Sequence, residues 1–297
     1  MKSLATYIMR GQMQAALVTM VFAALSLVLA PFSYVSGGII ALVTLRNGAQ
    51  AGLVVAAIAG LAMAALSMWM IDSPLLALIF ALVVWLPVWI LALVLRRSIS
   101  LALTMAVGGL LGLLAVIGMH VVLGDTVGWW QQVLDKVLAD ALNKQALDLS
   151  SVLGSTAQLM TAIMASAFLL SATIALFLGR WWQALLYNPG GFGKEFNELR
   201  LDKTGAVLTV LVTVWAVVGG GIGSLAADMA IVSVALYAVS GLALLHCWTE
   251  RAGVSGLWLL GVYVLLMFFL PQLAVLLALA GLADAWVDLR RFIKAKL

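Results

Sequence analysis

The apolar residues of this chain form long runs separated by short polar or basic segments. Ten runs can be distinguished, at residues 11–30, 32–45, 50–71, 74–95, 99–123, 154–179, 205–225, 228–247, 254–270 and 271–285. An α-helix needs about 20 apolar residues to cross the hydrocarbon core of a bilayer. The pattern therefore predicts an all-α, polytopic transmembrane helical bundle of about 8–10 membrane helices. The runs at 32–45 and 271–285 are short for a crossing, so each is predicted to be re-entrant or to lie in a thinned bilayer.

Composition supports the same class of protein. Hydrophobic residues make up 65% of the chain, charged residues only 9%, and the mean hydropathy is +1.17. Soluble domains contain about 25% charged residues, so a water-soluble fold is excluded. Among the prolines, only Pro87 lies inside a run, and it predicts a kink in the helix over 74–95.

The basic residues predict the orientation of the chain. If the N-terminus is cytoplasmic, only Lys136 and Lys144 of the 16 basic residues fall on the external side, as the positive-inside rule requires. We expect a multi-pass protein of a bacterial inner (cytoplasmic) membrane with both termini cytoplasmic. Lys2 and Arg10 precede the first run as in a signal peptide, but Pro31 follows directly after Ala30, so an uncleaved first helix is predicted.

We expect residues 1–297 to form a single transmembrane domain with two polar loops and a basic tail at 286–297. The external loop 124–152 contains an amphipathic helix whose apolar face is formed by Trp130, Leu134, Val137, Leu138 and Ala141. The cytoplasmic loop 180–203 contains a second one, because Phe192, Phe196 and Leu199 recur at helical spacing. These three residues and Arg200 form either the buried side of an interfacial helix or a docking face for a partner.

The same cytoplasmic loop carries a resemblance to a known family. The residues concerned are Arg180-Trp181-Trp182, Pro189 with its glycines, Glu195-Phe196 and Leu199-Arg200-Leu201. With the apolar multi-span chain, they resemble the YybS-like family of uncharacterised bacterial inner-membrane proteins. That family is distantly similar to the substrate-binding components of energy-coupling factor transporters, which capture vitamins or metal ions from outside. The resemblance implies a transporter coupling subunit with ATPase as a partner, and no substrate-contacting residue is carried over.

Four polar residues are predicted at the external ends of the runs. Asp72, His120, Asp125 and Asp228 would then lie on one side of the membrane, where they could converge on a cation or an amine-bearing solute. Carboxylates and an imidazole are ligands for several different metal ions, so the pattern is not specific to one metal. The alternative is helix capping by ordinary loop-end carboxylates, since Asp228 opens a helix and a carboxylate there meets the helix dipole favourably.

Glycines and tryptophans inside the runs have two interpretations. Gly37–Gly38 and Gly219–Gly221 favour close helix packing over open backbone that would coordinate an ion. Trp85, Trp89 and Trp215 favour packing over the lining of an apolar cavity. The tryptophans at run ends, Trp182 among them, are expected at the membrane interface.

Recognisable catalytic motifs are missing from the sequence, so we predict no catalytic residue, no cofactor and no enzyme activity. The segment Gly190–Lys194 lacks a phosphate-loop pattern, because Asn188 replaces its first glycine and Glu195 its Ser or Thr. Basic residues are scattered at run ends, which excludes nucleic acid as a partner. The runs contain essentially no charged residue, which argues against ion-driven transport by buried carboxylates.

Together these features predict a membrane-embedded solute-binding or transport component that needs a separate energising partner. Its small-molecule solute is unknown, and its expected partners are membrane lipid and a coupling subunit or another membrane protein. The alternative is a non-enzymatic structural or assembly protein of the cell envelope that recruits partners through its cytoplasmic loop and tail.

Overall fold

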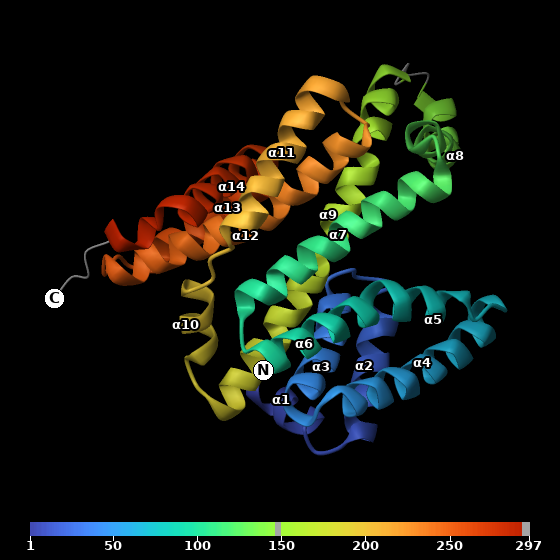
Figure 1. The fold of residues 1–297 in the computed structure, drawn as a ribbon. Coiled ribbons are helices and arrows are strands. Elements are labelled where there is room, and N and C mark those ends of the chain that lie inside the picture. Colours follow the sequence, from blue (N-terminus) through green and yellow to red (C-terminus); the bar gives the residue numbers. More distant parts are fainter. Residues whose placement is uncertain (146–149, 293–297) are drawn as a thin grey trace. The chain divides into compact units, whose positions relative to one another are not determined.

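The computed structural model describes residues 1–145 and 150–292, and their regular structure is helical throughout (Figure 1). The predicted all-α fold is confirmed. Six helices in this part of the chain are long and apolar enough to cross a membrane, which makes this a multi-pass membrane protein. They are Ala49–Met70, Leu75–Ser98, Leu101–Leu123, Val152–Tyr187, Leu225–Arg251 and Leu270–Val287.

The chain divides into two compact units. Unit 1 contains Met1–Gly108 and Leu170–Leu199, and unit 2 contains Gly109–Leu169 and Arg200–Leu297. Two long helices, α7 (Leu101–Leu123) and α9 (Ser150–Tyr187), contribute residues to both units.

Unit 1 is built around a central helix, α3 (Phe32–Asn47), in which every residue from Ser36 to Leu45 is buried. A helix that is apolar on all sides needs neighbours on all sides, and α3 packs against α2, α4 and α6. The other elements of the unit are α1 (Lys2–Ile8), α2 (Gln12–Leu25), α4 (Ala49–Ile71), α5 (Leu75–Phe80), the π-helical η1 (Ala81–Trp85), α6 (Leu86–Ser98) and α10 (Gly191–Asn197).

Glycines allow α3 and α9 to pack closely. A Cβ atom at Gly179 of α9 would lie 2.6 Å from the Gly38 carbonyl oxygen and 2.9 Å from the Leu42 nitrogen. A Cβ atom at Gly38 would likewise lie 3.3 Å from the Ala175 carbonyl oxygen. The two distances at Gly179 leave no room for a side chain, and the distance at Gly38 is shorter than an ordinary van der Waals contact. The packing interpretation of Gly37–Gly38 is therefore confirmed.

Pro87 changes the geometry of its helix without ending it. Proline has no N–H group to offer the carbonyl of Val83, and its ring crowds that carbonyl. The five residues Ala81–Trp85 adopt a π-helical turn directly before it, while the helical segment continues from Leu75 to Ser98. The irregularity expected at Pro87 is therefore a π-helical turn.

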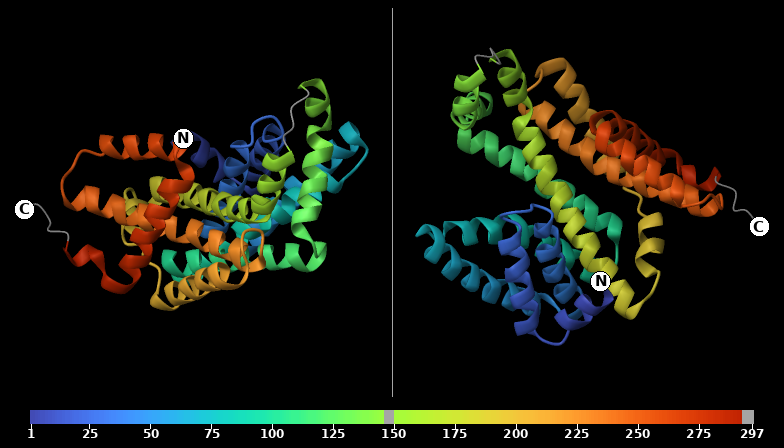
Figure 2. Two further views of the ribbon diagram at one scale, coloured as in Figure 1. Left: turned by 90° about the horizontal axis from the view of Figure 1, so that it is seen from above. Right: turned by 180° about the vertical axis from the view of Figure 1, so that it is seen from behind.

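Unit 2 centres on α12 (Leu225–Arg251), which packs against α11 (Lys203–Gly219) and α14 (Leu270–Val287). Figure 2 shows α12 and α14 side by side in the orange and red part of the chain. A Cβ atom at Gly241 would overlap the Leu277 carbonyl, and one at Gly281 would overlap the Tyr237 carbonyl. The unit also contains α8 (Thr126–Gln145), α13 (Leu257–Phe268) and the 3₁₀ helix η2 (Leu289–Phe292).

Several predicted boundaries are corrected. The α9 helix continues to Tyr187, so the predicted cytoplasmic loop begins about eight residues later than expected, at the Asn188-Pro189-Gly190 turn. Trp182, expected at a helix end in the membrane interface, is fully buried. This segment contains no helix breaker before Asn188, so the helix continues. Burial of the apolar Trp182 ring in the core of unit 1 is more favourable than a position at the membrane interface.

The distribution of short helices also differs from the prediction. The run at 271–285 belongs to α14, whose 18 residues make it one of the six membrane-length helices. The runs at 11–30, 205–225 and 254–270 form helices of only 14, 17 and 12 residues. In the second case Gly219–Gly221 ends α11 and forms the turn to α12, with Gly221 at φ +67°. Neither interpretation of this glycine cluster was right.

The amphipathic segment that was predicted to be external forms the helix α8. The indole Nε1 of Trp130 donates to the Thr161 hydroxyl of α9 at 3.0 Å, which holds the start of α8 against α9. Val137, on the same predicted face, is 73% exposed. The predicted positions from Leu138 onward lie outside the residues whose side chains the structure describes.

Candidate functional site

A histidine and an aspartate meet inside unit 2. The Nε2 atom of His120, in the last turn of α7, lies 2.8 Å from Oδ2 of Asp228, in the first turn of α12. The residue Asp228 is 1% exposed and the side chain of His120 is 17% exposed. The two residues are 108 positions apart in sequence, so only the packing of α7 against α12 joins them.

Helix capping does not explain the position of the Asp228 carboxylate. The cap of α12 is Ser224, whose hydroxyl accepts a hydrogen bond from the Ala227 N–H at 3.2 Å. The carboxylate is directed at His120 instead. Its second oxygen, Oδ1, is buried and has no hydrogen-bond partner among the described residues. Because a buried acceptor without a donor is costly, Oδ1 is a position at which a donor from a bound molecule would be stabilised.

An apolar cluster lies one helical turn below the pair. Its buried residues are Val116, Ala165, Leu169 and Val232, of which Val116 is one turn before His120 and Val232 one turn after Asp228. In such surroundings an electrostatic interaction is stronger than in water. Above the pair, the turn before α12 is held close to α8 and α9, since a Cβ atom at Gly223 would lie 2.9 Å from Val127 and 3.5 Å from Gln158.

The structure unites two of the four predicted ligand-binding residues. Asp125 is exposed, and its Oδ1 accepts the Gly128 N–H at 2.9 Å, so the capping interpretation is correct for this residue. Asp72 belongs to unit 1, where it ends α4 with φ +52°. In the described part of the chain no group of three or more His, Cys, Asp or Glu residues is arranged to hold a metal ion.

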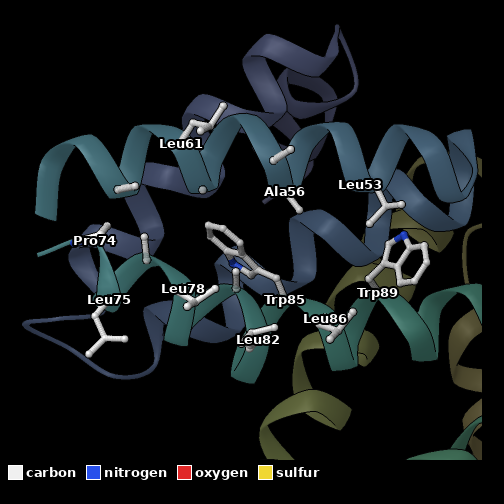
Figure 3. A pocket seen from close by; sticks show the side chains of 15 residues that line it. Leu53, Ala56, Leu61, Pro74, Leu75, Leu78, Leu82, Trp85, Leu86 and Trp89 are labelled. Carbon is white, nitrogen blue, oxygen red and sulfur yellow. The ribbon is translucent and has the colours of Figure 1, made fainter. Parts of the chain in front are cut away.

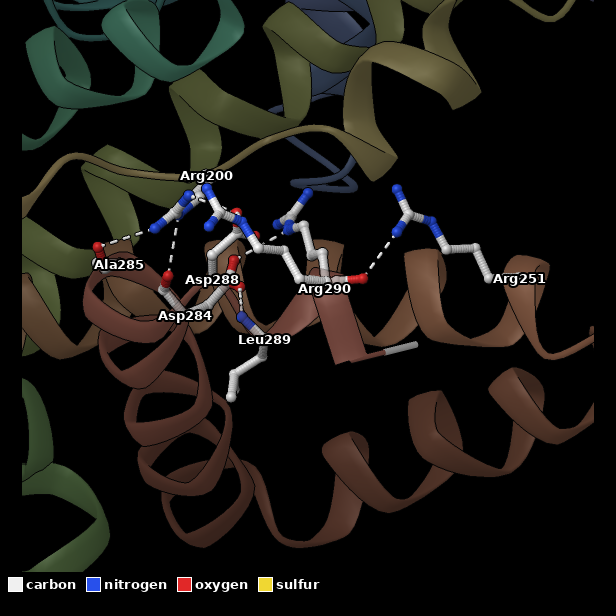
Figure 4. Close-up of polar contacts among 8 residues, drawn as sticks. Arg200, Arg251, Asp284, Ala285, Asp288, Leu289 and Arg290 are labelled. Atoms are coloured by element: carbon white, nitrogen blue, oxygen red, sulfur yellow. Dashed lines mark hydrogen bonds and ion pairs between the residues drawn. The ribbon is translucent and has the colours of Figure 1, made fainter. Parts of the chain in front are cut away.

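A second polar cluster, which sequence reasoning missed, lies at the end of α14 (Figure 4). Asp284 is fully buried and accepts hydrogen bonds from the Leu289 N–H and the Arg290 Nε, both at 2.9 Å. Arg251 donates to the Arg290 carbonyl at 2.8 Å, and Arg291 pairs with Asp288 at 2.5 Å. The prediction that the apolar runs contain essentially no charged residue is therefore wrong, since Asp228 and Asp284 lie buried in α12 and α14.

Some residues of the predicted basic tail and docking face bind other residues of this chain. Arg290 is 7% exposed and is directed at Asp284, while Arg200 donates to the Asp284 carbonyl at 2.9 Å and pairs with Asp288 at 3.3 Å. Lys294 and Lys296 lie outside the described residues. The tail is thus anchored at Arg290 by an aspartate that was read as part of an apolar run.

The aromatic residues of α10 also contact their own chain. Phe192 and Phe196 each pack against Phe177 of α9 with ring centroids 5.5 Å apart, and Glu195 pairs with Arg180. Leu199 is 2% exposed but follows the end of α10 at Asn197, so it does not share the helix face as predicted.

The described residues also form an apolar crevice in unit 1 of about 780 Å³ between α4 and the α5–α6 segment (Figure 3). Its walls include Leu53, Gly60 and Leu82, with the rings of Trp85 and Trp89. Both indole N–H groups donate to protein acceptors, at 2.9 Å to Ser36 Oγ and 3.1 Å to the Ala49 carbonyl. Trp85 and Trp89 therefore both pack and line a cavity, whereas Trp215 is 51% exposed on α11.

No family model, curated protein or solved structure matches this chain.

Proposed function

We propose that this chain is a non-enzymatic, membrane-embedded solute-binding or transport component, and that Asp228 and His120 recognise a positively charged group such as a protonated amine. The observation that carries the proposal is the buried Oδ1 of Asp228, which has no partner while Oδ2 contacts His120. Ionisable residues within membrane helices are costly, and their usual explanation is function.

The chemistry of the pair favours a cation over an anion. When His120 donates through Nε2, Asp228 stays an acceptor at Oδ1, and an ammonium N–H placed there would form a charge-assisted hydrogen bond. An anionic solute would meet only the carboxylate's unfavourable charge.

The driving force and the cellular location are part of this proposal. We propose a bacterial inner-membrane protein with cytoplasmic termini, energised by a separate coupling subunit with ATPase, as the YybS-like resemblance implies. A nucleotide-binding loop is not recognisable in the sequence, which supports an external source of energy.

The proposal is tested on protein purified in dodecyl maltoside. Thermal unfolding is measured with methylammonium, choline and putrescine as probes, and with acetate as the anionic comparison. We expect at least one amine to raise the melting temperature of the wild type, and Asp228→Asn to abolish that shift. Asp125→Asn is the matched control, since an exposed cap retains its acceptor oxygen.

An unchanged amine response in Asp228→Asn would contradict the proposal, as would a stabilisation by acetate equal to that by the amines. Because Asn is isosteric with Asp and can still accept from His120, the variant is expected to fold. Its folding is checked by the protection of Cys247, which is buried and is the chain's only cysteine.

The second candidate function, a cell-envelope structural or assembly protein, is favoured by the arginine-rich cluster around Asp284 and Asp288. Arg291 is largely exposed there and would meet an acidic partner. Affinity purification from gently solubilised membranes separates the two functions. Coupling and ATPase subunits would support transport, and division or wall-synthesis proteins would support assembly.

A further inference from the structure

The apolar crevice of unit 1 is open because small residues line one of its walls. On α4 these are Ala56, Ala57, Gly60 and Ala64, and they lie opposite the larger side chains of α5–α6. The lining of α4 extends from Leu53 to Ala64, which corresponds to a groove of about 16 Å at the helical rise of 1.5 Å per residue. Trp85 and Trp89 are held in place by their hydrogen bonds, so the groove does not close by rotation of its aromatic residues.

The lining restricts the chemistry of the occupant. Each of the lining side chains is apolar, and the two indole N–H groups are already paired. Both walls belong to membrane-length helices, Ala49–Met70 and Leu75–Ser98. A polar solute would lose its hydration here without any compensating hydrogen bond. A hydrocarbon chain has no hydrogen bonds with water to lose, and it fills the space.

One end of this groove is positively charged. On α6, Arg96 follows Trp89 by seven residues and Arg97 follows Leu86 by eleven. At 100° per residue each arginine lies within about 20° of the lining residue before it, about two turns further along the same face for Arg96 and about three for Arg97. Arg96 donates to the Leu45 carbonyl at 2.7 Å. Arg97 is exposed and forms no ion pair with a described acidic side chain.

The α4 side of the same end is polar as well. Gln50 is exposed, lies three residues before Leu53 and seven before Ala57, and so shares their helix face. An apolar groove that ends at an arginine and an amide is complementary to an amphiphile with an anionic head and a hydrocarbon chain.

We propose that this crevice is a binding site for an anionic phospholipid, with one acyl chain between α4 and α5–α6 and the phosphate group at Arg97. Charge complementarity identifies the occupant, because a zwitterionic lipid offers the same chain but no net negative charge to the arginine. The site is separate from the proposed amine site and does not depend on it.

The test is native mass spectrometry of the detergent-purified, delipidated full chain with added phosphatidylglycerol or phosphatidylcholine of identical acyl chains. We expect the wild type to retain phosphatidylglycerol preferentially. Arg97→Gln should lower that preference about fivefold, the factor expected for one basic residue near an anionic lipid surface. Lys203→Gln, an exposed basic residue of unit 2, is the matched control and should leave it unchanged.

A second variant tests the chain-binding groove. A Cβ atom at Gly60 would meet only the Trp85 ring, at 3.6 Å, so Gly60→Leu fills the crevice without a backbone clash and should reduce retention of both lipids. Ala57→Phe fills the crevice from an exposed position, and this variant is used instead if Gly60→Leu does not fold. Equal retention of both lipids by the wild type, full retention by the filled variant, or equal competition by glycerol phosphate without a chain would each overturn the proposal.

Discussion

The buried pair of Asp284 and Arg290 makes a strong prediction about stability. The Asp284 carboxylate is fully buried and uses both oxygens, one for the Leu289 N–H and one for the Arg290 Nε, each at 2.9 Å. Arg290 is itself 7% exposed. Asp284→Ala therefore leaves a buried guanidinium without its carboxylate and a backbone N–H without its acceptor.

The magnitude follows from this geometry. Removal of one partner of a buried ion pair costs about 3–5 kcal/mol, because the remaining charge stays desolvated. Replacement of both partners by apolar residues is often close to neutral. We expect Asp284→Ala to lose about 3–5 kcal/mol, and the double variant Asp284→Ala with Arg290→Met to recover most of that loss. Asp288→Asn is the control. It affects the ion pairs with Arg291 and Arg200, whose side chains are 78% and 30% exposed, and should cost less than about 1 kcal/mol.

Stability is measured by titration with sodium dodecyl sulfate in dodecyl maltoside micelles. Cys247 is 3% exposed, so the rate of its labelling by a maleimide reports the opening of α12. A double-mutant cycle gives the coupling free energy of the pair. If Asp284→Ala unfolds within about 1 kcal/mol of the wild type, or if the double variant is as unstable as the sum of the single ones, the reasoning is wrong.

Two further predictions concern α12. Gly241→Ala places a methyl group on the Leu277 carbonyl, so α12 and α14 must separate, and we expect the same titration to show a loss of about 1–3 kcal/mol in stability. Gly261→Ala, in open space on α13, is the control and should change stability little. Similar losses at both sites would refute the close-packing argument. Ser224→Ala removes the hydroxyl that accepts the Ala227 N–H and should lower stability by about 1 kcal/mol. Ser224→Asp retains an acceptor and should remain near the stability of the wild type. Equal losses in both variants would exclude capping as the cause.

The pattern of apolar runs predicted the helices well, because hydrocarbon as a solvent requires each crossing to satisfy its own backbone hydrogen bonds. Pro87 and the glycines of α3 were likewise interpretable, since backbone chemistry acts locally. The errors arose where tertiary packing outweighs local signals. Trp182 was assigned to the interface from its position after Arg180, yet the core of unit 1 buries it.

The candidate site was only half predictable. The types of residue indicated that Asp228 and His120 were candidates, but Asp125 and Asp72 carried the same signal and turned out to end or cap helices. No spacing rule connects residues 108 positions apart. Asp284 was missed because a single acid in an apolar run gives no local indication of the arginine that pairs with it.

The amino-acid sequence by itself determined that lipid surrounds this protein, that its fold is helical and roughly where its helices lie in the sequence. These properties depend on how many apolar residues follow one another. Only the tertiary structure decided which polar groups are buried together and which small residues leave a crevice. Both depend on how helix faces meet, and that is set by close packing between residues distant in sequence.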